Sequence, residues 1–160
     1  MNGRGTPALL VLAKAGVAYT VHPYQHNPAS RSFGEEAAAA LAVPPARVFK
    51  TLLVDVDGQL VVAVVPVSGS LDLKALAKLS GNRKTDTVPL KEVQPLTGYM
   101  RGGVTAIGGK KNYPVFVDET IELFEVVAVS AGVRGTQILI APADYLRAVG
   151  ATVGAIATFT

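Results

Sequence analysis

The sequence contains no cysteine among its 160 residues, so it can form neither a disulfide nor a cysteine-ligated zinc site. Thiolate catalysis by a side chain of the protein is excluded for the same reason. The absence favours a reducing cytoplasm as the place where the protein works. Charged residues are also scarce, at 17%, and a mean hydropathy of +0.36 argues against a disordered chain.

Long apolar runs are missing as well. No run approaches the roughly 18 residues of a membrane-spanning helix, so we expect no membrane segment. The apolar stretch 7–16 has the length of a signal sequence, but Lys14 and Gly16 end it as they would end a helix, and no small-residue cleavage motif follows. We interpret this stretch as the first helix.

Hydrophobic residues make up 49% of the chain, which suits one compact domain with a full core, spanning residues 1–160. Fifteen Lys and Arg residues against twelve Asp and Glu residues leave a net charge of +3. Such a mild basic excess permits an anionic partner without requiring one.

Hydrophobic spacing and turn residues predict alternating helices and strands. Ser32 precedes Glu35 by three residues, a capping-box pattern, and Asp57-Gly58 is typical of a tight turn between antiparallel strands. Strands outnumber helices and several are joined by short turns, which predicts an α+β domain with a mixed, largely antiparallel sheet and flanking helices. The expected helices cover 7–16, 32–43, 70–81, 89–98 and 141–150, and the expected strands cover 17–24, 46–56, 60–67, 102–109, 113–118, 123–130 and 135–140.

One charge in the predicted strand 46–56 is out of place. Successive side chains of a strand alternate between its faces, so Lys50 shares the more apolar face with Val48, Leu52 and Val54. A lysine there either extends its ammonium group past the strand end to solvent, or binds phosphate or carbonyl oxygens of a ligand inside an apolar wall. The residues alone leave both interpretations open.

The glycine-rich segment 102–109 invites comparison with a phosphate-binding P-loop. Gly103 and Gly108 have the P-loop spacing, but Gly109 stands where the lysine belongs, so we do not expect an NTPase. The segment can present backbone N–H groups to a phosphate or a carbonyl, or it can simply form a turn with a bulge.

Two other residue types are candidates for chemistry: histidine as a metal ligand and serine as a nucleophile. His22 and His26 lie roughly 13 Å apart if both are on one strand, too far to share a metal ion, so we predict no metal. Ser130 ends an apolar strand without a recognisable base, which favours a turn role or the holding of a substrate carbonyl over nucleophilic attack. A broken basic surface is also possible, formed by Arg83, Lys84, Arg101, Lys110, Lys111 and Arg134.

Four segments together resemble the YbaK/EbsC family of free-standing Cys-tRNA(Pro) deacylases, which are related to the editing domain of bacterial prolyl-tRNA synthetases. The resemblance extends from Thr6 to about Ala157, and the order and spacing of the segments make it specific. The segments are "HPYQHNPASRSFGEEAAAALAVPPARVFKTLLV", "VPVSGSLDLKALAKLSGNRK", "GYMRGGVTAIGGKK" with "YPVFVDE", and "VSAGVRG".

The resemblance implies an editing-domain fold and trans-editing hydrolysis of the ester that joins a mischarged amino acid to tRNA. It matches the family's functional lysine to Lys50, its pocket glycine to Gly102, its strand-end serine to Ser130 and its tyrosine to Tyr24. Lys50 would then hold the charged 3′ end of the aminoacyl-tRNA. The predicted substrate contacts also include Thr51, Gly103 and Gly132, and the predicted tRNA contacts are Lys110 and Lys111.

The chain departs from the family pattern at two places. Gln137 stands where an aspartate is common, and Thr105-Ala106 stands where Ser-Pro is usual.

An aminoacyl ester is already activated, so its hydrolysis needs positioning and carbonyl polarisation more than a strong base. In the family that the chain resembles, the substrate's own cysteine thiol is the favoured attacking group.

No cofactor is expected, and prolyl-tRNA synthetase is a plausible partner. Two alternatives stay open. One is hydrolysis of another mischarged tRNA such as Ala-tRNA(Pro), and the other is a non-catalytic module that binds tRNA or a synthetase.

Overall fold

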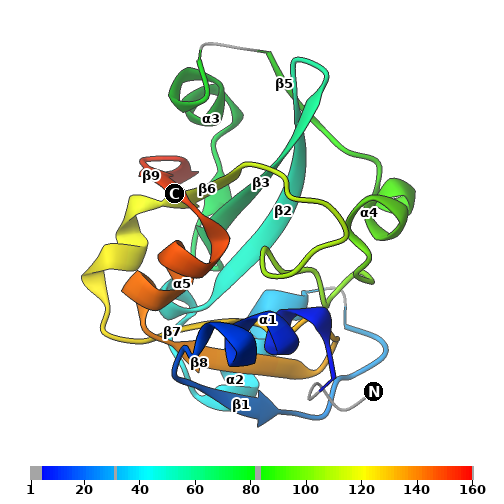
Figure 1. Ribbon diagram of the computed structural model, residues 1–160, viewed down its shortest axis with the longest axis vertical. Helices are drawn as coiled ribbons and strands as arrows, with labels where there is room; N and C mark the ends of the chain where they lie inside the picture. The colour runs from blue at the N-terminus through cyan, green and yellow to red at the C-terminus, as the bar shows by residue number, and fades with distance from the viewer. Residues whose placement is uncertain (1–4, 31, 82–83, 160) are drawn as a thin grey trace.

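The computed structural model describes residues 5–30, 32–81 and 84–159, and their strands form two main sheets (Figure 1). The first has three strands in the order β1-β8-β7, with both pairs antiparallel. It is built from β1 (Tyr19–Pro23), β7 (Val127–Ser130) and β8 (Thr136–Ile140).

The second sheet has five strands in the order β5-β2-β3-β6-β9. β2 runs antiparallel to β3 and β5, whereas β6 runs parallel to both β3 and β9. A separate antiparallel pair joins β4 to β10. The strands are β2 (Phe49–Val56), β3 (Gln59–Pro66), β4 (Ser70–Leu71), β5 (Thr85–Thr87), β6 (Val115–Asp118), β9 (Thr152–Gly154) and β10 (Ala157–Thr158).

Helices start and end where local chemistry allows. The Thr6 hydroxyl accepts a hydrogen bond from the Leu9 N–H at the start of α1, and Gly16 ends that helix with a φ of 69°. None of the helices in the described ranges combines the length and apolar character that crossing a bilayer requires. The helices are α1 (Pro7–Ala15), α2 (Phe33–Leu41), α3 (Leu73–Leu79), α4 (Leu90–Thr97) and α5 (Pro142–Val149), with 3₁₀ turns η1 (Pro45–Arg47) and η2 (Glu119–Leu123).

The strands bury both faces because helices cover the two outer sides. On β7, Val127 and Val129 enter the central core while Ala128 packs toward Ala38 of α2 on the other side. On β3, alternate residues divide in the same way between the central core and a smaller cluster around Leu76 of α3. Both sheets therefore share one core, which α2 and α3 flank from outside.

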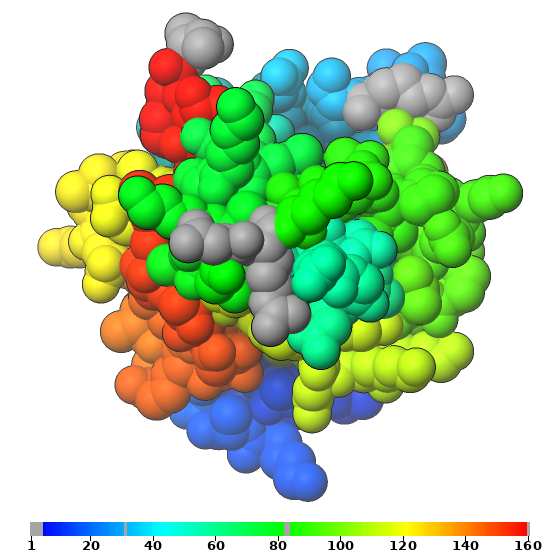
Figure 2. All heavy atoms as spheres, turned by 90° about the horizontal axis from the view of Figure 1, so that it is seen from above, coloured from blue at the N-terminus to red at the C-terminus, as the bar shows by residue number. Residues whose placement is uncertain are grey.

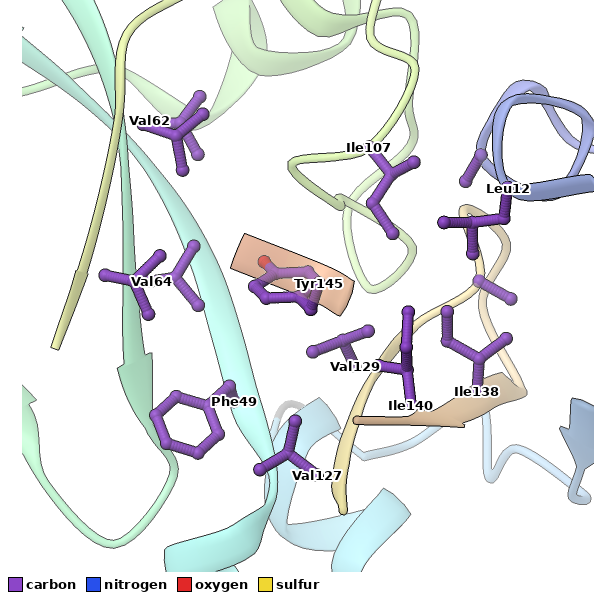
Figure 3. Packing of buried hydrophobic residues seen from close by; sticks show 14 of the residues in the cluster. Leu12, Phe49, Val62, Val64, Ile107, Val127, Val129, Ile138, Ile140 and Tyr145 are labelled. Atoms are coloured by element: carbon purple, nitrogen blue, oxygen red, sulfur yellow. The ribbon is translucent and has the colours of Figure 1, made fainter. Parts of the chain in front are cut away.

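Tyr145 of α5 lies in the middle of this core and is fully buried (Figure 3). Around it, Val64 reaches in from β3, Val129 from β7, Ile140 from β8 and Ile107 from the loop after α4. Burial raises the pKa of Tyr145. The core thus joins segments from most of the chain's length.

The hairpin of β2 and β3 closes through the predicted tight turn. Asp57 and Gly58 both have positive φ, 52° and 86°, as a two-residue turn of this kind requires. The Gly58 N–H also donates to Asp55 Oδ1 at 2.7 Å. Figure 2 looks onto this end of the molecule and shows the turn exposed beside the segments from α3 to α4.

The α+β class, the largely antiparallel sheets and the flanking helices confirm the sequence-based expectation. Short strands of two or three residues, β4, β5, β9 and β10, were not predicted because they are too brief to show a hydrophobic alternation.

The expected strand at 102–109 is wrong, since this segment is a loop. The Tyr99 hydroxyl donates to the Ile107 carbonyl at 2.6 Å and to the Gly108 carbonyl at 3.2 Å. A β-carbon on Gly108 would lie 2.8 Å from the Pro7 carbonyl oxygen. The loop is therefore held by a buried tyrosine and packed closely against the start of α1, rather than hydrogen-bonded to a neighbouring strand.

The predicted capping box at Ser32 is also wrong, because the Ser32 side chain makes no cap hydrogen bond. The carboxylate that makes hydrogen bonds here is that of Glu36 rather than that of Glu35. Glu36 accepts from the Asn27 N–H at 2.8 Å with one oxygen and lies 2.6 Å from His26 Nδ1 with the other. Glu36 thereby ties the loop after β1 to α2.

Asp118 anchors the C-terminal segment. It is 2% exposed, and its Oδ1 accepts from the backbone N–H groups of Ile156 and Ala157, both at 2.9 Å. Its Oδ2 accepts from the Thr120 N–H and hydroxyl. A buried carboxylate with its lone pairs used in this way stabilises the fold because no donor around it is left unpaired.

Replacing Asp118 should therefore destabilise the protein. We expect Asp118→Ala to lower the free energy of unfolding by about 2–4 kcal/mol, since buried N–H groups lose a charged acceptor. Urea denaturation followed by circular dichroism measures this, with the exposed Glu119→Ala as the control. Equal denaturation midpoints for the two variants would contradict the anchoring role.

The Glu36 contacts predict a pH dependence of stability. The hydrogen bond from His26, helped by that from the Asn27 N–H, lowers the pKa of Glu36 below its ordinary value of 4.5. The stability that Glu36 adds is thus present above pH 4.5 and is lost as the pH falls through the lowered pKa. Glu36→Gln should be less stable than wild type at pH 7, and the gap should shrink in acid. The exposed Glu35→Gln should show no such pH-dependent gap.

Candidate active site

In the described part of the chain the two sheets meet at one isolated bridge, in which Val48 pairs parallel to Ala128 near the start of β7, the edge strand of the other sheet. Past this bridge, the same side of β2 is next paired at Val54, with Thr87 of β5. Between the two points no strand of the described chain lies against that edge of β2. The gap is where the sheets diverge.

A cavity of about 530 Å³ lies at this gap, within the size range of small-ligand sites. Its wall is mainly apolar, and the charged residues that line it are Lys50, Arg101 and Glu35. The lining residues come from β2, the first turns of α2 and α3, the segment after β3, β5, α4 and the loop after it, and the ends of β7 and β8. They include Phe33, Leu53, Val67, Leu73, Gly102, Val104, Ser130 and Gln137.

The parallel bridge brings three polar residues into one row. Lys50 and Ser130 each lie two residues beyond the bridged pair Val48 and Ala128, so both point to the same face of their strands. Ser130 is in turn the direct partner of Gln137 across β7 and β8. All three line the cavity.

Lys50 is half-buried, and no hydrogen bond or ion pair of its ammonium group occurs among the described residues. The sequence-based question about Lys50 is therefore answered in part: it lies in a cavity wall, beside the apolar residues Val48 and Leu52. An unpaired cation at the edge of an apolar cavity is suited to an anionic ligand.

Ser130 lies at the same site with no base beside it. Its side-chain oxygen accepts a hydrogen bond from the Gly132 N–H at 3.1 Å, which leaves its own hydrogen free to donate. Neither His22 nor His26 lines the cavity. Gly132 does not line the cavity; it has a φ of 95°, and a β-carbon there would lie 2.8 Å from the Tyr99 ring.

The two loop glycines differ in what they offer. Gly102 lines the cavity with a φ of 88°, and a β-carbon there would meet Arg134 Nε at 2.7 Å and the Phe33 ring at 3.1 Å. The Gly103 N–H already donates to the Met100 carbonyl at 2.9 Å. The expectation that both glycines present N–H donors to a ligand is thus wrong for Gly103, which closes a turn instead.

Two arginines and an aromatic ring frame the cavity mouth. The guanidinium carbons of Arg101 and Arg134 lie 5.5 Å and 4.9 Å from the Phe33 ring centroid. Arg134 also donates through Nε and Nη2 to the Arg101 carbonyl, at 3.1 Å and 2.6 Å. The sequence predicts these arginines only as surface charge and gives no signal for Phe33, because no local pattern shows that residues so far apart converge.

Tyr24 is half-buried next to this group but does not line the cavity. Its N–H donates to the Gly135 carbonyl at 2.8 Å. Burial, with a smaller contribution from Glu36, raises the pKa of Tyr24, while the Gln137 side chain acts in the opposite direction by hydrogen bonding. Tyr24 thus lies beside Gln137, which lines the cavity.

Thr51 lies on the opposite face of β2 from Lys50. It lines the cavity, but it also borders Tyr145, whose raised pKa it partly offsets. Lys110 and Lys111 are exposed and do not line the cavity, and Lys110 Nζ lies 3.3 Å from the Pro95 carbonyl. Arg83 lies outside the described residues.

Metal ligands do not gather in the described part of the chain, where no group of three or more His, Asp or Glu side chains lies close enough to hold an ion. The site therefore consists of one lysine, one serine hydroxyl, one buried amide and glycine backbone in an apolar cavity.

Comparison with known proteins assigns the chain to a family. The model of the aminoacyl-tRNA editing domain matches residues 26–148. A protein of Enterococcus faecalis (strain ATCC 700802 / V583), named "Putative Cys-tRNA(Pro)/Cys-tRNA(Cys) deacylase EbsC", is 45% identical over 114 residues, which is 70% of this chain and 69% of that protein.

Two solved structures have the same fold. One, described as a "putative trans-editing enzyme for prolyl tRNA synthetase", superposes with a TM-score of 0.85 at 24% identity, covering 98% of this chain and 97% of the other. The other, the hypothetical protein APE2540, has a TM-score of 0.85 at 24% identity over 95% and 99% of the two chains. On the family match and the 45% identity, this chain belongs to the aminoacyl-tRNA editing domain family.

Proposed function

We propose that this protein removes cysteine from mischarged tRNA(Pro) in trans, in the cytoplasm, and that the cavity beside Lys50 binds the aminoacyl-adenosine end of the tRNA. Membership of the editing family makes the chain an aminoacyl-tRNA deacylase. The choice of cysteine follows the name of the 45% identical relative. The observation that carries the proposal is a lysine without a hydrogen-bond or ion-pair partner among the described residues, next to hydrogen-bond donors in an apolar cavity.

Charge decides how the tRNA end would enter. Lys50 and Arg101 supply two positive charges to the cavity wall against one negative charge from the exposed Glu35. A terminal phosphate would pair with Lys50, leaving the small aminoacyl group among apolar side chains such as Val48 and Leu52. Lys110 and Lys111, on the outer surface, would contact phosphates further along the acceptor end.

The residues at the site can polarise and position an ester, and in the described chain no base is hydrogen-bonded to the Ser130 hydroxyl to make it a nucleophile. The Ser130 hydroxyl and the Gly102 N–H are donors for the ester carbonyl oxygen, on which negative charge develops. The attacking group is then the thiol of the substrate. Its sulfur, as the thiolate, bonds to the ester carbonyl carbon, the bond from that carbon to the ribose oxygen breaks, and the ribose oxygen takes a proton from solvent.

These steps release tRNA with a free 3′ end and a cyclic thioester of cysteine, which water opens to cysteine. A folded domain of this size contacts only part of a tRNA, so recognition of tRNA(Pro) would come from prolyl-tRNA synthetase acting as a partner.

Lys50→Ala should reduce deacylation of Cys-tRNA(Pro) by roughly ten- to a hundred-fold, because one charge-assisted hydrogen bond contributes about 1.5–3 kcal/mol. Lys50→Arg should not restore the rate, since a planar guanidinium does not replace a compact ammonium group. Release of labelled cysteine measures the rate, with the exposed Lys14→Ala as the matched control. A near-wild-type rate for Lys50→Ala would refute the proposed site.

Cys-tRNA should be hydrolysed much faster than Ser-tRNA or Ala-tRNA. A thiol with a pKa near 8.5 is partly ionised at neutral pH, whereas a serine hydroxyl is not and alanine has no nucleophile. Parallel assays with the three charged tRNAs, repeated from pH 6 to pH 9, should show a rate for Cys-tRNA that rises toward the thiol pKa. Equal rates on Cys- and Ala-tRNA would indicate an attacking water and an alanine-editing enzyme, and no turnover of any of them would indicate a binding module.

A further inference from the structure

One buried polar atom at the cavity has no role in the fold. Gln137 is 7% exposed, and its Oε1 has no hydrogen-bond partner among the described residues. Most buried polar groups are paired, because desolvating an unpaired amide oxygen costs free energy. Gln137 lines the cavity, so a ligand there can supply the missing donor.

The position of Gln137 is well defined. It lies in β8 between β1 and β7, directly opposite Ser130 on one side and His22 on the other. It shares a strand face with Leu139, which packs under α2, and this places its side chain beside the first turn of α2. The Gln137 side chain also lies close to the Tyr24 hydroxyl, since it acts to lower the pKa of Tyr24.

We propose that Gln137 Oε1 accepts a hydrogen bond from the α-amino group of the aminoacyl ester, and so makes Gln137 a specificity-determining residue. This inference rests on the proposed function. Ser130, its neighbour in the row, is the donor for the ester carbonyl, and the amino group is one bond from the carbon next to that carbonyl. The Gln137 acceptor beside the Ser130 donor therefore complements the amino donor beside the carbonyl acceptor of an aminoacyl ester.

The neutral amide suits a site that already contains Lys50. A carboxylate at position 137 would pair with the lysine or favour only the charged ammonium form of the substrate. A carboxamide oxygen accepts a hydrogen bond from the amino group in either protonation state. The amide therefore recognises the amine without competing with the terminal phosphate for Lys50.

The test compares two esters that differ only in the amine. tRNA(Pro) charged with cysteine is compared with tRNA(Pro) charged with 3-mercaptopropionate, which keeps the thiol and lacks the amino group. Wild type should prefer the cysteinyl ester by about tenfold or more in kcat/KM, since a site built to pair with a polar group rejects a ligand that lacks it. Gln137→Met, similar in size but without an acceptor oxygen, should lose this preference.

Two further variants separate recognition from stability. Gln137→Glu keeps an acceptor oxygen and should keep the preference for the cysteinyl ester, while its carboxylate competes for Lys50 and lowers the rate on both esters. The exposed Gln59→Met should behave as wild type. Thermal unfolding checks that each variant folds. A Gln137→Met protein that keeps the full preference, or a wild type that treats both esters alike, would overturn the proposal while leaving the deacylase function intact.

Binding gives an outcome that does not depend on turnover. Amide-linked cysteinyl-adenosine and its 3-mercaptopropionyl counterpart cannot be hydrolysed as esters, and calorimetry measures the dissociation constant of each. A preference of wild type for the cysteinyl compound that Gln137→Met lacks supports the amine subsite even if no tRNA is deacylated. Equal dissociation constants for wild type would overturn it.

Discussion

The contact on which the site depends is the parallel bridge between Val48 and Ala128. It is the only backbone pairing in the described chain that joins the two main sheets, and both residues are almost fully buried. Because the bridge is parallel, Lys50 and Ser130 follow it at matching positions on one face. The sheets then separate, and the edge of β2 beyond the bridge becomes a cavity wall. A larger side chain at Ala128 would press on Ala38 and displace α2.

The binding properties of the cavity follow from its small number of charged residues. One lysine among apolar side chains faces little competition from water or from other ions, so its interaction with a phosphate is stronger than it would be at an exposed surface. In the described wall the carboxylate is that of the exposed Glu35, and the two histidines are elsewhere, one of them held by Glu36. An enzyme built in this way depends on the reactivity of its substrate. Substrate choice then becomes a matter of which donors and acceptors line the wall.

Close contacts between backbone segments fix the loops around this cavity. A β-carbon on Gly103 would lie 2.9 Å from the backbone of Val133 and Arg134, and backbone atoms cannot move aside as a flexible side chain can. The loop after α4 therefore rests directly on the turn between β7 and β8. Arg134, bonded to the Arg101 carbonyl and stacked on Phe33, joins that turn to α2 as well.

The sequence by itself determined the α+β class, the hairpin at Asp57-Gly58 and the unusual face of Lys50, because alternation, turn residues and helix ends are local properties. It also carried the family resemblance. Tertiary structure alone decided that 102–109 is a loop, since the Tyr99 hydroxyl that holds it acts from outside the segment. It alone decided that Gly103 has no free N–H and that Phe33, Arg101 and Arg134 meet. The row of Lys50, Ser130 and Gln137 likewise follows from one bridge between residues eighty positions apart, and no local pattern encodes such a pairing.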